Sequence, residues 1–492
     1  MLTLLIVLPV IGALLMPLLP ERASRPLALI TSGLTFVLSL WMLTRFDVQQ
    51  PVLQFREFVP WLPPLGLNYS LGVDGLSLPL IVLGTFLTLV VVFTGEKSAH
   101  RLFYALVLLA SAGISGALAA QNLLLFILFY EVELAPFYLL ILIWGGQRRE
   151  QAAVKFLLYT AVSGILVLAA FLAMGWLTHA PSFEYQDIRT AGLAPTTQAL
   201  LLLLLVLGFG IKMPLVPLHS WLPDAYVEAS TPTAILLGGV LAKLGTYGLV
   251  RFALGCFPQA WGQFSGLLAL VAAIGIAYGA LAAIAQKDIK RMVAYSSVGH
   301  MSYVLLAAAA HTHLSMVGAI AQMISHGLIL ALLFYLVGVI ETKVGTRELD
   351  VLNGLLNPLR GLPTTSALLI LGGMASAGIP GLMGFVAEFL IFQGSYRIFP
   401  LPTLIAVVGT GLTAVYFVIM INRTCFGRLD NATAYYPRVL WWETMPALVL
   451  TLLILFLGVQ PTWLVRWSET TSAQIVAAIP EATEIVASLA NS

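Results

Sequence analysis

Charged residues and cysteines are both scarce in this chain of 492 residues. Only 9% of the residues are charged, against about 25% in soluble domains, and 60% are hydrophobic. A soluble fold has too little interior to bury that much apolar surface. The two cysteines, Cys256 and Cys425, are far apart in the sequence and have neither CxxC nor histidine spacing, so we expect neither a disulfide framework nor a metal cluster.

Motifs for nucleotide, flavin or metal binding are also missing. No GxGxxG, P-loop, CxxC pair, HExxH or GxSxG stands in a usable context. We therefore expect no cofactor, no metal and no nucleic-acid partner for this chain. Electron carriers, if the protein needs them, are expected in other subunits.

Long apolar runs are what the sequence has in abundance. Each run has about 20 residues, enough to cross a hydrocarbon core of about 30 Å as a helix. Closed barrels also satisfy their backbone in lipid, but the alternating pattern of barrel strands is not seen. We predict an all-α polytopic membrane protein with about fourteen transmembrane helices, and a structured loop at 45–74. The expected spans are 2–19, 27–44, 75–94, 102–119, 122–145, 152–178, 199–217, 233–255, 263–286, 292–310, 313–341, 363–396, 402–426 and 440–466.

Lysines and arginines are unevenly divided between the loops that join these spans. The odd-numbered loops hold fifteen of the 24, and the even-numbered loops with the C-terminal tail hold six. Because basic residues favour cytoplasmic loops, the odd-numbered loops are expected on the cytoplasmic side and both termini on the other. The remaining three lysines fall inside apolar spans, and they are Lys155, Lys212 and Lys243.

Two expected spans are interrupted in matching ways. The seventh runs into GFGIKMPLVPLHSWLPDA and the twelfth contains GGMASAGIPGLMGFVAEF, so both carry helix-breaking residues. Paired broken helices indicate an internal transporter repeat, and their odd spacing of five spans makes the second copy inverted. We predict inverted five-helix repeats of helices 4–8 and 9–13. The expected division is 1–101 for helices 1–3 with the loop, 102–255 for the first repeat, 263–426 for the second, and 440–492 for helix 14 and the tail.

Glu131 lies in the middle of the fifth expected span. A charged side chain at the bilayer centre costs at least about 2.5–3.5 kcal/mol, so its presence needs a reason. We predict that Glu131 takes up and releases a proton, and the alternative is a static buried ion pair. Glu133, about 200° around the same helix, is expected to point elsewhere and to make an interhelical contact.

Three further charged residues are candidate proton carriers in addition to Glu131. Lys212 directly precedes the break in the seventh span, where unwound backbone and water can solvate an ammonium group. Lys243 is eleven residues into the eighth span among small residues, and Glu388 occupies in the second repeat the place of Lys212 in the first. Static pairing with Glu131 is the alternative for both lysines.

Histidines and two weaker candidates complete the set. His300 and His326 fall on the tenth and eleventh spans, and an imidazole is suited to relay protons between the repeats. The alternative is a core histidine with ordinary hydrogen bonds. Lys155 lies near its span end and could instead reach the membrane surface. His219 follows the seventh-span break at a possible proton entry, and Lys290 is expected to be a simple basic residue of a cytoplasmic loop.

These residues stand in motifs that resemble a known family, the antiporter-like subunits of complex I and their relatives in sodium/proton antiporters. The similarity covers almost the whole chain and is dense in FYEVELAPFYLLILIWGG, KMPLVPLHSWLPDA, AQKDIKRMVAYSSVGHM and QMISHGLILALLFYLVG. The resemblance implies that a glutamate, two lysines and a residue of the broken twelfth helix form a proton path. The matching positions are Glu131, Lys212, Lys243 and Glu388.

A glutamate at position 388 is typical of the middle member of the family. The segments AYVEASTPTAILLGGVLAKLGTYG, VGTRELDVLNGLLNPLRGLP and RLDNATAYYPRVLW resemble the D-type subunits of cyanobacterial photosynthetic complex I, particularly their carbon dioxide uptake variant. The resemblance implies a proton-translocating subunit in a thylakoid membrane and a ferredoxin- or NAD(P)H-dependent plastoquinone reductase, with iron–sulfur clusters and quinone in other subunits. It further implies F-type distal and B-type proximal partners, lipids, and a carbonic-anhydrase-like module.

Two other functions remain open. One is a secondary sodium/proton antiporter subunit, which sodium-dependent activity would distinguish. The other is a scaffold that transports nothing and docks neighbouring membrane subunits. A scaffold has no need of four charges in the middle of the membrane, which favours transport.

Overall fold

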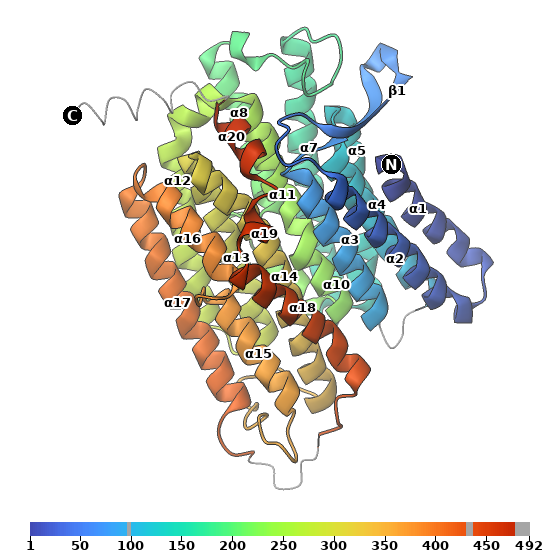
Figure 1. The fold of residues 1–492 in the computed structure, drawn as a ribbon, viewed down its shortest axis with the longest axis vertical. Coiled ribbons are helices and arrows are strands. Elements are labelled where there is room, and N and C mark those ends of the chain that lie inside the picture. The colour runs from blue at the N-terminus through green and yellow to red at the C-terminus, as the bar shows by residue number, and fades with distance from the viewer. Residues whose placement is uncertain (96–99, 430–435, 478–492) are drawn as a thin grey trace.

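The computed structural model describes residues 1–95, 100–429 and 436–477, and Figure 1 shows them as an elongated bundle of helices. A small hairpin crosses one end of the bundle. Lys97, one of the fifteen basic residues of the odd-numbered loops, lies outside the described residues.

The N-terminal part holds the hairpin and the first four long helices. Its elements are α1 (Leu2–Leu15), α2 (Glu21–Arg45), β1 (Gln54–Leu62), β2 (Leu67–Val73), α3 (Ser77–Thr94) and α4 (Arg101–Ala119). The middle part continues with α5 (Leu123–Val132), α6 (Leu134–Trp144), α7 (Arg149–Leu177), α8 (Pro195–Lys212), α9 (Trp221–Glu228), α10 (Thr231–Leu236), the π-helical η4 (Leu237–Leu241), α11 (Ala242–Gly248) and the π-helical η5 (Leu249–Leu254).

The C-terminal part is helical throughout its described residues. Its elements are α12 (Pro258–Ile284), α13 (Ile289–Ala310), α14 (His313–Val344), α15 (Pro363–Ser376), α16 (Met383–Tyr396), α17 (Pro400–Cys425), α18 (Trp441–Val459), α19 (Thr462–Val465) and α20 (Glu469–Ala477).

Twelve helical segments of the described chain are long and apolar enough to cross a membrane. The polytopic helical fold is therefore confirmed. The two other expected spans fall on α1, with 14 residues, and on the interrupted pair α15 and α16, with 14 residues each. The total of fourteen stays a prediction, as do the boundaries of the four expected domains.

The structured loop between α2 and α3 is a β-hairpin. Strands β1 and β2 pair antiparallel, with Glu57 opposite Leu71 and Pro60 opposite Asn68. Gly66 ends the turn at φ +64°, a conformation that glycine adopts without steric cost. The prediction of an all-α chain missed the β-structure of this loop.

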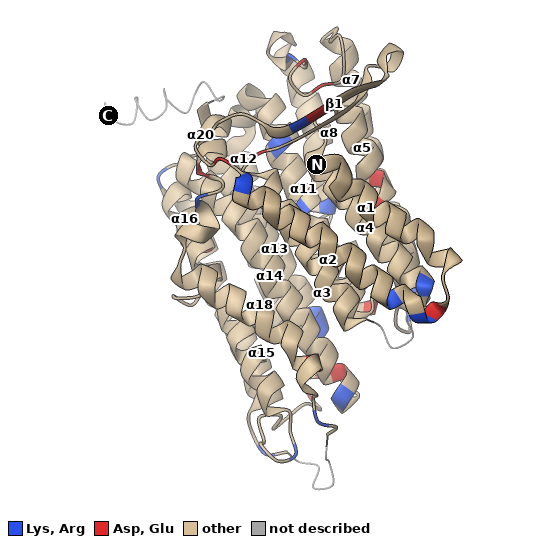
Figure 2. Ribbon diagram, turned by 45° about the vertical axis from the view of Figure 1, so that its right-hand side comes forward, with Lys and Arg blue, Asp and Glu red and all other residues tan. Residues whose placement is uncertain are grey.

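Odd-numbered loops contact one another at one end of the bundle and even-numbered loops contact one another at the other end, as the basic-residue distribution predicts. At one end, the backbone N–H of Ile289 donates to the carbonyl of Arg347, and that of Gly146 donates to Glu228. At the other end, the N–H of Leu123 donates to Phe183. Figure 2, where charged residues are coloured on the ribbon, shows most of them toward the two ends and fewer along the helices between.

The two predicted breaks are present. Helix α8 ends at Lys212, and α9 begins nine residues later at Trp221. The indole N–H of Trp221 donates to the carbonyl of Ile211 at 2.8 Å and so satisfies a backbone acceptor near the break. Between α15 and α16 the chain turns through Gly378, at φ +68°, and Gly381, at φ +90°.

A third break was not expected. The fifth span is interrupted at Glu133, which lies between α5 and α6 with φ −75° and ψ −19°. Pro136 explains the interruption, because it has no N–H to donate to Val132 and its ring crowds that carbonyl.

Candidate functional site

Lys212 is one of three charged residues of the first repeat that are at most 2% exposed, together with Glu133 and Lys243. Its side chain is 2% exposed, and its ammonium group forms an ion pair with the carboxylate of Glu133, which is fully buried. The ammonium also lies 3.4 Å from the ring centre of Tyr130 and 3.3 Å from its backbone carbonyl oxygen. A cation at the carboxyl end of α5 is favoured there because the carbonyls of a helix end carry partial negative charge.

Glu133 therefore makes the interhelical contact expected of it, but its partner is Lys212, which was expected to pair with Glu131. Glu131, the expected partner, is only partly buried and packs against Gly164 of α7, where an added Cβ would overlap its carboxylate. It lies close enough to Lys212 for an electrostatic interaction. The two acids face different helices, as predicted, and what the prediction missed is which of them contacts Lys212.

Lys243 and His326 contact each other directly. The Lys243 ammonium lies 2.8 Å from Nδ1 of His326, and Nε2 of that ring lies 3.2 Å from the hydroxyl of Ser297. The ammonium also donates to the carbonyl oxygen of Gly238 at 2.5 Å. Gly238 lies in the π-helix η4, whose altered hydrogen-bonding pattern accompanies functional sites in many helices.

The line of buried polar groups continues from His326 to Glu388. The rings of His326 and His300 have centroids 5.4 Å apart, and Nδ1 of His300 lies 3.6 Å from the Glu388 carboxylate. Glu388 also accepts a hydrogen bond from the Thr410 hydroxyl at 2.8 Å. Among the described residues, this series of contacts joins the eighth expected span to the broken twelfth.

No hydrogen bond or ion pair joins the Lys212 ammonium to that of Lys243 within the described residues, although their helices pack closely. A Cβ on Gly245 would come 2.6 Å from the backbone nitrogen of Met213, which places α11 directly against the break after α8. The four residues predicted to carry protons thus form two groups, and their roles stay predictions.

Lys155 and His219 lie in side clusters rather than in this line. Lys155 forms an ion pair with Asp224 at 2.7 Å, and Asp224 also pairs with Arg291 at 3.2 Å. Nε2 of His219 lies 3.1 Å from the hydroxyl of Tyr278. Neither Lys155 nor His219 has a direct contact with the line among the described hydrogen bonds and ion pairs.

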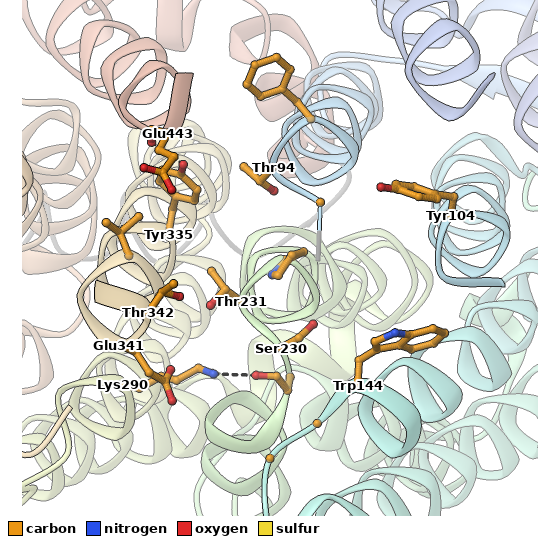
Figure 3. Close-up of a pocket in the computed structure, with 18 of the residues that line it drawn as sticks. Thr94, Tyr104, Trp144, Ser230, Thr231, Lys290, Tyr335, Glu341, Thr342 and Glu443 are labelled. Carbon is orange, nitrogen blue, oxygen red and sulfur yellow. Dashed lines mark hydrogen bonds between the residues drawn. The ribbon is translucent and has the colours of Figure 1, made fainter. Parts of the chain in front are cut away.

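Lys290 differs from the other basic loop residues because its side chain is buried. It is 2% exposed, and its ammonium donates to the carbonyl oxygen of Ala229 at 2.6 Å. It faces a cavity of about 1020 Å³ at the end of the bundle that carries most basic loops, with Glu341 and Ser230 beside it (Figure 3). The cavity lining does not include any residue of the line described above.

Sequence reasoning missed two contributors to the site. Glu133 carried a usable signal, because a second acidic residue three positions before a proline stands at a helix break. Lys290 carried none, since a lysine two residues into a helix beside other basic residues looks like any cytoplasmic loop residue.

Residues 120–413 match the family model described as "NADH:quinone oxidoreductase/Mrp antiporter, TM". The chain belongs to this family. The matched region contains every residue of the two groups around Lys212 and Lys243, including Glu388.

Relatives of the chain in cyanobacteria extend over its whole length. It is 39% identical to "NAD(P)H-quinone oxidoreductase chain 4 1" of Synechococcus sp. (strain JA-2-3B'a(2-13)), over 99% of this chain and 94% of the relative. It is 36% identical to "NAD(P)H-quinone oxidoreductase chain 4 3" of Trichormus variabilis, over 99% and 93%.

Solved structures show the same fold. A chain of "Respiratory complex I from Thermus thermophilus with bound NADH" superposes with a TM-score of 0.89 at 29% identity, covering 97% of this chain and 100% of that one. A chain of "Structure of Mrp complex from Dietzia sp. DQ12-45-1b" gives 0.88 at 21% identity, covering 97% and 98%. The second similarity concerns the fold alone.

Proposed function

We propose that this chain is a proton-translocating membrane subunit of a quinone oxidoreductase complex, as the names of its full-length relatives suggest. The observation that carries the proposal is the series of contacts from Lys243 through His326 and His300 to Glu388. All four side chains are at most 4% exposed, although each can bind or release a proton. Burial of so many such groups in apolar helices is costly unless they have a function.

The chain's own residues would move protons and not electrons. His326 can accept a proton at Nδ1 from Lys243 and lose one at Nε2 toward Ser297, because each ring nitrogen has a polar neighbour. Quinone and iron–sulfur clusters are proposed to belong to other subunits. Conformational or electrostatic changes in those subunits would alter the Lys212 ion pair and so drive each step.

The proposal also covers the membrane and the enzyme complex in which the chain works. We propose a cyanobacterial thylakoid membrane, a ferredoxin- or NAD(P)H-dependent plastoquinone reductase, and distal and proximal antiporter-like neighbours. A carbonic-anhydrase-like module that uses proton export for carbon dioxide uptake is the finer proposal. It is supported by sequence resemblance, and carbon dioxide uptake by a strain lacking this gene would test it.

The experiment that tests the proposal is Lys212→Ala in the intact complex. Removing the ammonium should abolish proton pumping in vesicles while a native gel still shows the assembled complex. Unchanged pumping would contradict the proposal and favour a scaffold. The family description also names the Mrp antiporter, which supports a second candidate, a sodium/proton antiporter subunit; this candidate predicts that pumping depends on sodium concentration.

A further inference from the structure

Two carboxylates lie near Lys212, one on each side of the junction between α5 and α6. Glu131 is the penultimate residue of α5, and Glu133 is the junction residue itself. Lys212 contacts Glu133 directly and interacts with Glu131 through space. The two acids therefore offer the same ammonium two different partners.

A glycine on a different neighbouring helix makes room for each acid. On α4, a Cβ at Gly113 would come 3.3 Å from the backbone nitrogen of Glu133 and 3.4 Å from its Cβ. On α7, a Cβ at Gly164 would overlap the carboxylate of Glu131. Glu133 thus packs toward α4 and Glu131 toward α7, so the carboxylates occupy separate sites.

Lys212 is placed where its side chain can change partners. It is the last residue of α8, directly before the break, so the backbone after it is not fixed by a continuing helix. The ring of Tyr130, at 3.4 Å, and the Tyr130 carbonyl, at 3.3 Å, provide contacts that do not depend on either carboxylate. Tyr130 is itself fixed by its hydroxyl, which lies 2.9 Å from that of Ser163.

We propose that Glu133 is the resting partner of Lys212 and that Glu131 is a second acceptor to which the ammonium moves during transport. This inference rests on the proposed function and deepens it. When the ammonium leaves, the buried carboxylate of Glu133 has no cation and takes up one proton from water in the path. At the same time Glu131, which holds a proton while it has no cation, releases that proton on pairing with the ammonium, and the return of the ammonium reverses both changes. Each half-cycle therefore binds one proton and releases one, and the net charge of the three groups stays constant.

The test is Glu133→Gln in the intact complex, measured as protons pumped per electron transferred in vesicles. The amide cannot ionise, so pumping should fall at least about tenfold while the complex stays assembled on a native gel. Glu133→Asp keeps the carboxylate and should restore at least half of the pumping, which a purely structural side chain would not require. Glu150→Gln, at an exposed residue of α7, is the matched control and should pump normally.

The outcomes separate a failure of this inference from a failure of the proposed function. Normal pumping by Glu133→Gln, together with loss in Lys212→Ala, would overturn the inference and leave Glu131 as the only acceptor. Normal pumping in both variants would instead overturn the proposed function. If Glu133→Gln does not assemble, Gly164→Ala is measured, because its Cβ displaces only the Glu131 carboxylate. Pumping should then fall severalfold, and unchanged pumping would overturn the inference.

Discussion

His326 occupies the position at which the buried line can be interrupted by a single side chain. One ring nitrogen faces Lys243 and the other faces Ser297, and the ring of His300 lies next along the line. A neutral imidazole has one donor and one acceptor nitrogen, so it fits between an ammonium and a hydroxyl group without leaving a polar atom unpaired. No other residue type fills both roles and can also carry a proton near neutral pH.

We expect His326→Ala to reduce proton pumping at least about tenfold with the complex still assembled, because relay groups of this kind contribute a factor of about 100 or more. Dye quenching in vesicles measures the change. His100→Gln is the matched control, since His100 is 63% exposed and should tolerate replacement. Pumping by His326→Ala at the normal rate would show that His326 is only a packed core histidine.

At the scale of elements, a buried ion pair ties the segment directly after the hairpin to η5. Asp74, between β2 and α3, accepts from Arg251 of η5 at 2.5 Å and from the backbone N–H groups of Leu76 and Ser77. Burial by itself raises the pKa of the Asp74 carboxyl, but Arg251 and the hydrogen bonds outweigh it and leave the pKa below its ordinary value. The carboxylate therefore stabilises the fold above its unfolded-state pKa, near 3.9, and loses this effect as pH falls through the folded-state pKa.

Asp74→Asn should lower the free energy of unfolding by about 3–5 kcal/mol at pH 7, because it leaves Arg251 buried without its counter-charge. Thermal unfolding in detergent measures the loss, which should be constant from pH 7 to pH 5 and shrink below about pH 4. Asp350→Asn is the control, since Asp350 is 49% exposed and pairs with Lys287 at the surface. Equal melting temperatures for the two variants would contradict this reading.

At the scale of the whole molecule, the distribution of basic loops predicts how the chain lies in the membrane. The hairpin and α20 lie at one end of the bundle, and the loop between α14 and α15 lies at the other (Figure 1). Both native cysteines are buried, so an engineered cysteine would be labelled without background. Val52 and Leu359 are suitable positions, being 58% and 88% exposed at opposite ends.

Val52→Cys and Leu359→Cys should react with a membrane-impermeant thiol reagent from opposite sides of a sealed vesicle. The Leu359→Cys variant should be labelled from the cytoplasmic side, because its end carries most basic loops. Labelling of both variants from the same side would contradict the bundle orientation. Reversed labelling would contradict only the assignment of the cytoplasmic face.

The sequence by itself determined the class of fold, the two predicted breaks and three of the seven buried charged residues in the described part of the chain. Apolar length, helix-breaking residues and the high cost of charge in lipid are local properties, so they can be read residue by residue. Lys212, Lys243 and Glu388 were found in this way, and the structure places each inside the bundle at no more than 2% exposure.

Pairing was decided only by the tertiary structure. Glu131 and Glu133 are indistinguishable by composition, and only the packing of α5 against α4, α7 and α8 shows that Glu133, not Glu131, contacts Lys212. The burial of Lys290 likewise depends on a cavity enclosed by helices far apart in the sequence. A side chain's partner depends on the directions of several helices at once, and no local pattern in the sequence records those directions.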